Sequence, residues 1–381
     1  MGPLAGLRIL EIASIGPGPM AAMLLADMGA EVVRVEKPGA ADIFPLPRQL
    51  DITARSRRCL ALDLKHASGH AALLRLLPGF DGLIEGFRPG VMERLGLGPD
   101  VCLAAAPRLV YGRMTGFGQS GPLAQAAGHD LNYLSLTGAL HAMGRAGAPP
   151  APPLNLIADY GGGAMFLAFG MVCALLERAT SGKGQVVDAA MTDGAAALTA
   201  LFWSLRAAGL WSDARGTNFL DGGAPFYDTY ATSDGRFVAV APLEPKFFAE
   251  LAQRIGLEPH FARSQYDRTL WPALRARLTG IFADKTRDEW RALLEGTDAC
   301  VTGVLTFAEA PLHPQNAARA VYTTLNGQTQ PAPAPRFGRS VPDTPRAPAA
   351  AGADTRAVLA EAGFAEAEIA ALLRGGAAAQ A

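Results

Sequence analysis

The first third of the chain alternates two kinds of apolar pattern, and this alternation limits the fold more than any other feature. Strand-like runs such as LRILEIA, AEVVRVE and RCLALDL are separated by helix-patterned runs such as PMAAMLLADMG and HAALLRLLPGF. Strands that alternate with helices usually pair in parallel, so the pattern predicts an α/β fold with a parallel sheet. Ligands of such sheets bind beyond the carboxyl ends of the strands, where residues 15–19 and 85–90 would form loops.

The loop at residues 15–19 follows a strand and precedes a helix, as the phosphate loop of a dinucleotide-binding fold does. Its glycines lack the GxGxxG spacing. Pro17 and Pro19 also remove backbone N–H donors that a pyrophosphate would need. Nicotinamide and flavin cofactors are therefore not expected.

The character of the sequence changes after about residue 190. A long apolar helix is expected near residues 195–210, followed by a strand, an Asp234-Gly235 hairpin turn, a second strand and a helix. We therefore expect a large domain with a Rossmann-like sheet over residues 1–190 and 330–381, a connecting helix over 191–221, and a smaller α+β domain over 222–329. The Pro-rich run 330–354 is expected to be extended, and the C-terminal GGAAAQA to fray.

Charge, cysteine content and hydropathy exclude several classes of protein. The 34 basic and 35 acidic residues give a net charge of −1, which argues against a nucleic-acid partner. The four cysteines show no CxxC or Cys/His ligand spacing, so we expect no metal site and reduced thiols in the cytoplasm. Residues 161–176 are short for a membrane span and end at Glu177 and Arg178, which favours a buried helix and no membrane association.

Two short polar strings carry the candidate chemistry, GHDLNY at residues 128–133 and NLIADYGGG at 155–163. Each holds one prominent ionisable residue, His129 and Asp159. An imidazole and a carboxyl on opposite sides of one carbon could remove a proton from one face and return it to the other. Alone, His129 could instead be a helix-capping or surface histidine, and Asp159 a helix cap.

Seven strings extend across nearly the whole chain in a characteristic order: LEIASIGPGPMAAMLLADMGAEVVRVEKPG, GFRPGVMERLGLGP, RMTGFGQSGPLAQAAGHDLNY, PLNLIADYGGG, GKGQVVDAAMTDG, LDGGAPFYDTY and GTDACVT. Together they resemble the α-methylacyl-CoA racemases, a family within the family III CoA-transferase superfamily. The resemblance implies an interlocked homodimer that binds acyl-CoA between the large domain of one subunit and the small domain of the other. It implies no cofactor, since CoA enters as part of the substrate thioester.

The same resemblance assigns roles to the polar residues. His129 and Asp159 match the two acid/base groups, serving the 2S and 2R faces, and Glu244 matches a carboxylate paired with the histidine. Glu244 could also be a solvated turn residue before a proline. We expect burial to raise the pKa of Asp159, and the backbone N–H of Asp130 to stabilise an enolate oxygen.

The positions that match CoA-binding residues of the family are Lys37, Leu62, Asp63, Leu64, Lys65, Gly86, Phe87, Arg88, Arg94, Gly128 and Tyr133. Lys37 replaces an arginine of the family, which keeps a positive charge for phosphate but loses the planar fork that stacks on adenine. Arg88 and Arg94 could instead form solvated ion pairs.

Two other functions compete with racemisation. In CoA transfer between carboxylic acids, Asp159 would attack as a nucleophile and form an anhydride, and no base would be needed at position 129. A catalytically idle acyl-CoA binding protein would bind thioester without either reaction. His129 and Glu244 favour the racemase, whereas the preferred acyl chain cannot be derived from the sequence.

Overall fold

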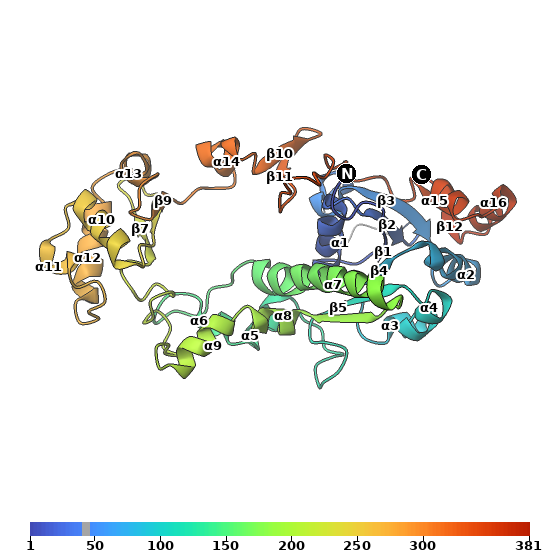
Figure 1. Ribbon diagram of the computed structural model, residues 1–381, viewed down its shortest axis with the longest axis horizontal. Coiled ribbons are helices and arrows are strands. Elements are labelled where there is room, and N and C mark those ends of the chain that lie inside the picture. Colours follow the sequence, from blue (N-terminus) through green and yellow to red (C-terminus); the bar gives the residue numbers. More distant parts are fainter. Residues whose placement is uncertain (40–45) are drawn as a thin grey trace. The chain divides into compact units, whose positions relative to one another are not determined.

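The computed structural model describes residues 1–39 and 46–381, which divide into two compact units (Figure 1). Unit 1 comprises Met1–Thr137, Leu154–Leu198 and Arg319–Ala381, and unit 2 comprises Gly138–Pro153 and Thr199–Ala318. The segment Gly138–Pro153 therefore leaves unit 1 after the first polar string and returns just before the second.

Unit 1 is built on a seven-stranded sheet with the strand order β12-β3-β2-β1-β4-β5-β6. The strands are β1 (Arg8–Ile12), β2 (Glu31–Glu36), β3 (Arg57–Leu62), β4 (Gly82–Glu85), β5 (Val110–Thr115), β6 (Val186–Ala190) and β12 (Ala378–Ala379). Strands β1 to β6 pair in parallel, while β12 is antiparallel to β3. The predicted α/β fold with a mainly parallel sheet is confirmed.

The C-terminal string, predicted to fray, is ordered. Ala378 and Ala379 pair with Leu62 and Ala61, and the N–H of Asp63 donates to the carbonyl of Ala377 at 2.8 Å. The prediction was wrong because these small residues cover the edge of β3, whose backbone groups would otherwise be open to water.

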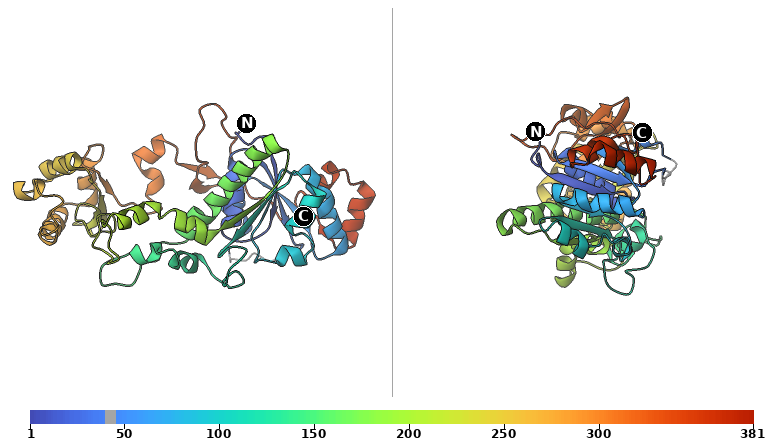
Figure 2. Two further views of the ribbon diagram at one scale, coloured as in Figure 1. Left: turned by 60° about the horizontal axis from the view of Figure 1, so that its bottom comes forward. Right: turned by 90° about the vertical axis from the view of Figure 1, so that its right-hand side faces the viewer.

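Helices cover both faces of this sheet, and Figure 2 shows α7 (Met165–Ser181, green) crossing it. Helix α7 contacts β5, β6 and α1 (Pro17–Asp27). On the opposite face of the sheet, alternate strand residues such as Leu10 and Leu83 pack against a layer of helices. This layer includes α2 (Ala67–Leu76), α4 (Pro99–Ala105), α15 (Thr355–Glu361) and α16 (Glu366–Arg374). Burial on both faces explains the nearly continuous apolar strands.

The remaining elements of unit 1 are short. They are α3 (Val91–Arg94), α5 (Asp130–Ser135), a π-helix (Leu156–Ala164), α8 (Met191–Ala197), the hairpin β10 (Tyr322–Leu325) and β11 (Gln328–Pro331), and 3-10 turns at Arg48–Leu50, Ile52–Ala54 and Leu77–Gly79. The single helix expected near residues 195–210 is divided into α8 and α9 (Ala200–Ala207), with the break at the boundary between the units. Helix α8 packs closely against the π-helix of unit 1, whereas α9 belongs to unit 2.

Unit 2 contains a three-stranded sheet and a helical layer. The strands of this sheet are β7 (Asp228–Ala231), β8 (Phe237–Val240) and β9 (Val301–Gly303). Besides α9, the helical elements are α6 (Ala139–Ala142), α10 (Pro245–Ile255), α11 (Pro259–Ala262), α12 (Trp271–Phe282), α13 (Arg287–Leu294), a 3-10 turn (Ala310–Leu312) and α14 (Pro314–Ala318). The predicted hairpin is confirmed, since β7 and β8 are antiparallel and Gly235 adopts a φ of 72° in the turn. Phe226, Phe248 and Phe282 lie in the aromatic core.

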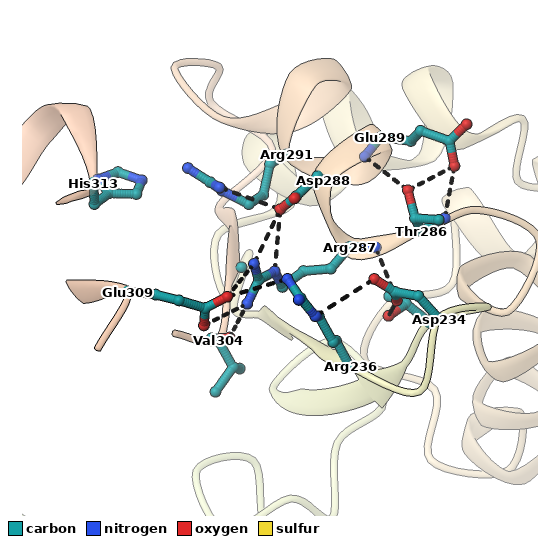
Figure 3. A network of polar contacts seen from close by, with 12 residues as sticks. Asp234, Arg236, Thr286, Arg287, Asp288, Glu289, Arg291, Val304, Glu309 and His313 are labelled. Atoms are coloured by element: carbon teal, nitrogen blue, oxygen red, sulfur yellow. Dashed lines mark hydrogen bonds and ion pairs between the residues drawn. The ribbon is translucent and has the colours of Figure 1, made fainter. Parts of the chain in front are cut away.

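A polar network holds the segment after β9 to the rest of unit 2 (Figure 3). Arg287 opens α13, is 3% exposed, and donates a fork of hydrogen bonds to Glu309 at 2.8 and 2.9 Å. It also donates to the carbonyl of Val304 at 3.1 Å. Arg236, on the hairpin, donates to Glu309 at 3.1 Å. The network therefore joins three segments through one carboxylate.

The π-helix and α7 form one helical run, Leu156–Ser181, that is long and apolar enough to cross a membrane. Its most apolar window has a mean hydropathy of 1.5, and 39% of that window is buried. The helix predicted to be buried is therefore only partly buried, with Phe169 69% and Leu176 73% exposed.

Candidate active site

A cavity of about 930 Å³ lies at the carboxyl ends of the parallel strands of unit 1. Residues at or just beyond the ends of β1 to β6 line it: Ile12, Glu36, Leu62, Gly86, Thr115 and Met191. The two loops predicted as walls contribute as expected, through Ile15, Gly16, Pro17 and Pro19 and through Gly86, Phe87, Arg88 and Pro89. The cavity thus occupies the usual binding position of an open α/β sheet.

His129 lies at the N-terminus of α5 and borders this cavity. It is the N-cap residue, and its extended backbone donates from its N–H to Oδ1 of Asn132 at 3.1 Å. Its carbonyl accepts from the N–H groups of Asn132 and Tyr133 at 2.8 and 3.2 Å. The backbone is therefore fixed on both sides, while the side chain is exposed at the cavity.

Asp159 lies in the first turn of the π-helix and borders the same cavity. Burial raises the pKa of Asp159, and the charge of Asp130 acts in the same direction. A hydrogen bond from Asn155 at 3.4 Å and the nearby His129 oppose these effects only in part, so the pKa of Asp159 stays above its usual value. The direction agrees with the sequence-based prediction and makes this carboxylate a better base near neutral pH.

Close packing holds the π-helix that carries Asp159. A Cβ at Gly194 of α8 would lie 1.8 Å from the carbonyl oxygen of Gly162, so only glycine allows this approach. A Cβ at Gly162 would in turn lie 2.4 Å from the backbone nitrogen of Ala195. Such π-helical turns occur often at functional sites, where they change the direction of a side chain.

Asp130 opens α5 and has a buried side chain beneath the cavity wall rather than within its lining. Its Oδ1 accepts hydrogen bonds from the backbone N–H groups of Ala158 and Asp159 at 2.8 and 2.7 Å. In the part of the chain that the structure describes, the backbone N–H of Asp130 itself has no acceptor. Its role as an enolate donor stays a prediction.

Tyr133 closes the cavity behind the first polar string. Its hydroxyl donates to the carbonyl of Gly128, and its ring meets Phe117 edge to face with centroids 4.9 Å apart. Burial and the charge of Asp159 raise the pKa of Tyr133, so this hydroxyl stays protonated and remains a donor. The ring therefore braces Gly128, the residue before His129.

A model of CoA-transferase family III matches residues 4–355. The chain belongs to this family. It is 47% identical over 369 residues to a mouse protein named alpha-methylacyl-CoA racemase, with 96% of this chain and 95% of the relative covered. The human protein of the same name is 44% identical over 370 residues, with the same coverage. Among solved structures, a CAIB/BAIF family protein from Brucella suis superposes with a TM-score of 0.83 at 25% identity, covering 95% of this chain and 99% of that one.

Most of the positions predicted from the resemblance to bind CoA lie together in this structure. Ten of them line the cavity: Lys37, Leu62, Asp63, Leu64, Lys65, Gly86, Phe87, Arg88, Gly128 and Tyr133. Arg94 does not line it, since this exposed residue ends α3. A contact of Arg94 with CoA therefore stays a prediction without support from this cavity.

Glu244 lies on unit 2, whereas all residues that line the cavity belong to unit 1. It is the N-cap residue of α10, with an exposed side chain and a carbonyl that accepts from Phe247 and Phe248 at 3.0 Å. Its pairing with His129 remains a prediction.

Several polar residues that line the cavity were not found from the sequence. Arg48 lines it and donates a fork to Glu36 at 2.6 and 2.7 Å. Ser14 borders it with a buried Oγ that has no partner among the described residues. The sequence does indicate a contact of Asn155 with Asp159, because the two residues are four positions apart and would lie on the same face of a helix. No feature of the sequence indicates that Arg48 and Ser14 line the cavity.

Proposed function

We propose that this protein interconverts the 2R and 2S epimers of 2-methylacyl-CoA thioesters. The observation that carries the proposal is that His129 and Asp159 border one cavity at the carboxyl ends of the sheet, with the pKa of Asp159 raised. The racemase names of the mouse and human relatives, which match nearly the whole chain, support the same activity.

In the proposed reaction, His129 removes the α-proton of the 2S epimer and Asp159 removes that of the 2R epimer. Each group then returns a proton to its own face when the other has acted as the base. The intermediate is an enolate, whose oxygen would accept from the backbone N–H of Asp130 at the start of α5. One such donor is typically worth roughly 10²–10³ in rate.

The charged residues around the cavity suit the CoA part of such a substrate. Lys37, Lys65 and Arg88 line the cavity and offer cations to phosphate groups. We propose no further cofactor, because proton transfer to and from carbon requires only a base, an acid and stabilisation of the enolate.

The racemase is favoured over CoA transfer by a specific feature of the cavity. A transferase needs a carboxylate nucleophile, and Asp159 would suffice for that role without a second acid/base group. The structure places a second proton-carrying side chain, His129, at the same cavity, where transfer through an anhydride has no need of it.

We also propose that the protein is a cytoplasmic homodimer. Helix α7 leaves large apolar side chains in water, including Met165, Phe169 and Leu176, which are 53%, 69% and 73% exposed. A patch of this kind is typical of a protein interface. Insertion of this run into a bilayer is disfavoured because its first turn carries Asp159 and the cavity wall. Sedimentation velocity of the full chain tests the dimer, and a monomer at micromolar concentration would contradict it.

Deuterium exchange tests the chemistry. Each epimer of a 2-methylacyl-CoA is incubated in deuterium oxide with the wild type, His129→Ala and Asp159→Ala, without any acceptor acid. We expect the wild type to exchange the α-hydrogen and invert C2, and both variants to lose inversion. In a second incubation a carboxylic acid is added, and CoA movement that depends on this acid, with no exchange in the first incubation, would support the transferase instead.

A further inference from the structure

The side chain of Asp130 connects the two segments that carry the candidate acid/base groups. It follows His129 directly, and its Oδ1 accepts from two consecutive backbone N–H groups, those of Ala158 and Asp159, which lie 28 and 29 residues further along the chain. The two short distances, 2.8 and 2.7 Å, show that both bonds are well formed. A single carboxylate oxygen thus fixes the peptide that bears Asp159.

The other oxygen of this carboxylate is unusual. Asp130 is 5% exposed, and its Oδ2 is buried without a hydrogen-bond partner among the described residues. A buried carboxylate is normally paired with a cation or fully hydrogen-bonded, because its desolvation is unfavourable. An incompletely paired charge at this place indicates a role that a neutral side chain would not fill.

Asp130 forms no ion pair among the described residues, although His129 acts on Asp159 and Arg88 on Tyr133 in the opposite direction to its charge. His129 and Tyr133 approach from the α5 side and Asn155 from the preceding turn. The other elements that pack on the π-helix bring no free cation among the described residues. On α1, Asp27 is paired with Arg55, on α7 Arg178 is paired with Asp81, on β5 Arg113 is paired with Glu85, and the acidic Asp188 of β6 and Asp193 of α8 repel each other.

We propose that the carboxylate of Asp130 is a positioning residue that ties the Asp159 peptide to the start of α5 and so sets the geometry of Asp159 against His129. This inference rests on the proposed racemase activity. The negative charge of Asp130 also favours the protonated form of Asp159. This brings Asp159 closer to the proton affinity that a base requires near neutral pH.

The test uses Asp130→Asn, which keeps an acceptor oxygen for the two N–H groups but removes the charge, and Asp130→Ala, which removes both. The matched control is Asp354→Asn. The partly buried carboxylate of Asp354 accepts a hydrogen bond from the N–H of Cys59 at 2.8 Å, and Asp354 does not line the cavity. Circular dichroism shows whether each variant is folded. Exchange in deuterium oxide is followed separately as exchange with retention and exchange with inversion, starting from the 2S epimer.

Retention on the 2S epimer requires only His129, whereas inversion requires Asp159 to deliver a proton. For Asp130→Ala we expect inversion to fall by about 10²-fold, the effect of a misplacement near 1 Å, while exchange with retention persists. For Asp130→Asn we expect smaller loss and an acid limb of the rate profile for the 2R epimer that moves to lower pH. The control should match the wild type in both readouts.

Two results would overturn the inference. Equal loss of retention and inversion in a folded Asp130 variant would indicate a general structural role. An Asp130→Asn variant with an unchanged pH profile and unchanged inversion would show that the charge has no part in setting Asp159. If the wild type itself gave no exchange, the proposed function would fail first, which keeps the two failures distinct.

Discussion

Two carboxylates, Asp159 in unit 1 and Glu309 in unit 2, occupy opposite electrostatic environments. Glu309 accepts from Arg287 and Arg236 (Figure 3). It also accepts from the backbone N–H of Thr306 at 2.9 Å. The hydrogen bonds from Arg287, and after them those from Thr306, hold the pKa of Glu309 well below its usual range. Asp159 has one amide donor, Asn155 at 3.4 Å, and burial together with the charge of Asp130 raises its pKa.

The difference shows how one type of side chain serves either structure or chemistry. A carboxylate with two arginines keeps its charge at all ordinary pH values and cannot exchange protons, so it acts as a fixed anchor. A partly buried carboxylate beside a like charge binds a proton more readily and can act as a base and then as an acid. A cavity is therefore a candidate site for proton transfer when it is lined by a partly buried carboxylate that no arginine neutralises.

The largest effect is expected when Asp159 loses its ability to carry a proton. Asp159→Asn keeps the size of the side chain, so the fold and melting temperature should be retained while inversion falls by roughly 10²–10⁴. Glu309→Gln is the matched control and should lower the melting temperature without a comparable loss of inversion. A reversed outcome, with Glu309 essential for inversion and Asp159 dispensable, would remove the basis of the comparison.

A second prediction concerns the anchor in unit 2. Arg287→Met removes the fork to Glu309 and leaves that carboxylate with Arg236 and the donors of Thr306, so we expect the melting temperature to fall by roughly 2–8 °C. Arg287→Lys keeps the positive charge but not the planar fork, so its melting temperature should lie between those of the wild type and Arg287→Met. Differential scanning calorimetry measures both. An unchanged melting temperature in Arg287→Met would show that the network contributes little to stability.

The fold was largely predictable from the sequence because its main signal is local. Strands β1 to β6 are buried on both faces and read as nearly continuous apolar runs, so their periods and the intervening helices identify the parallel sheet. The position of the cavity followed from the same rule, because loops at the carboxyl ends of such strands converge. Resemblance to a known family then supplied roles for His129 and Asp159.

Features that depend on contacts between distant residues were not predictable. The bonds from Ala158 and Asp159 to Asp130 join segments that only the folded chain brings together, and the pairing of β12 with β3 is of the same kind. The π-helix around Asp159 lacks a local signature, since its glycines are equally compatible with a turn or an ordinary helix. The break between α8 and α9 coincides with the boundary between the two units, which only the folded chain defines.

A third, smaller effect is expected in the pH dependence of inversion from the 2R epimer. Asp159 must be ionised to accept a proton, so kcat/KM should fall as the pH drops through the raised pKa of this group. Asn155→Ala removes the donor that favours the ionised form, which moves this acid limb to higher pH. Asn316→Ala, which removes a bond to the Ala310 carbonyl in unit 2, serves as control. A limb that moves to lower pH would show that Asn155 does not stabilise the charged form.

The smallest effect is expected from Tyr133→Phe, which tests whether the protonated hydroxyl next to Asp159 only braces the first polar string. The change removes the hydrogen bond to the Gly128 carbonyl and keeps the ring against Phe117. One such bond contributes about 0.5–1.5 kcal/mol, so inversion should fall by roughly 2- to 10-fold through displacement of His129. Loss should be shared by retention and inversion on the 2S face, because His129 acts in both. A loss confined to inversion would instead mean that Tyr133 acts on Asp159, and the hydroxyl would then join Asp130 among the groups that set its proton affinity.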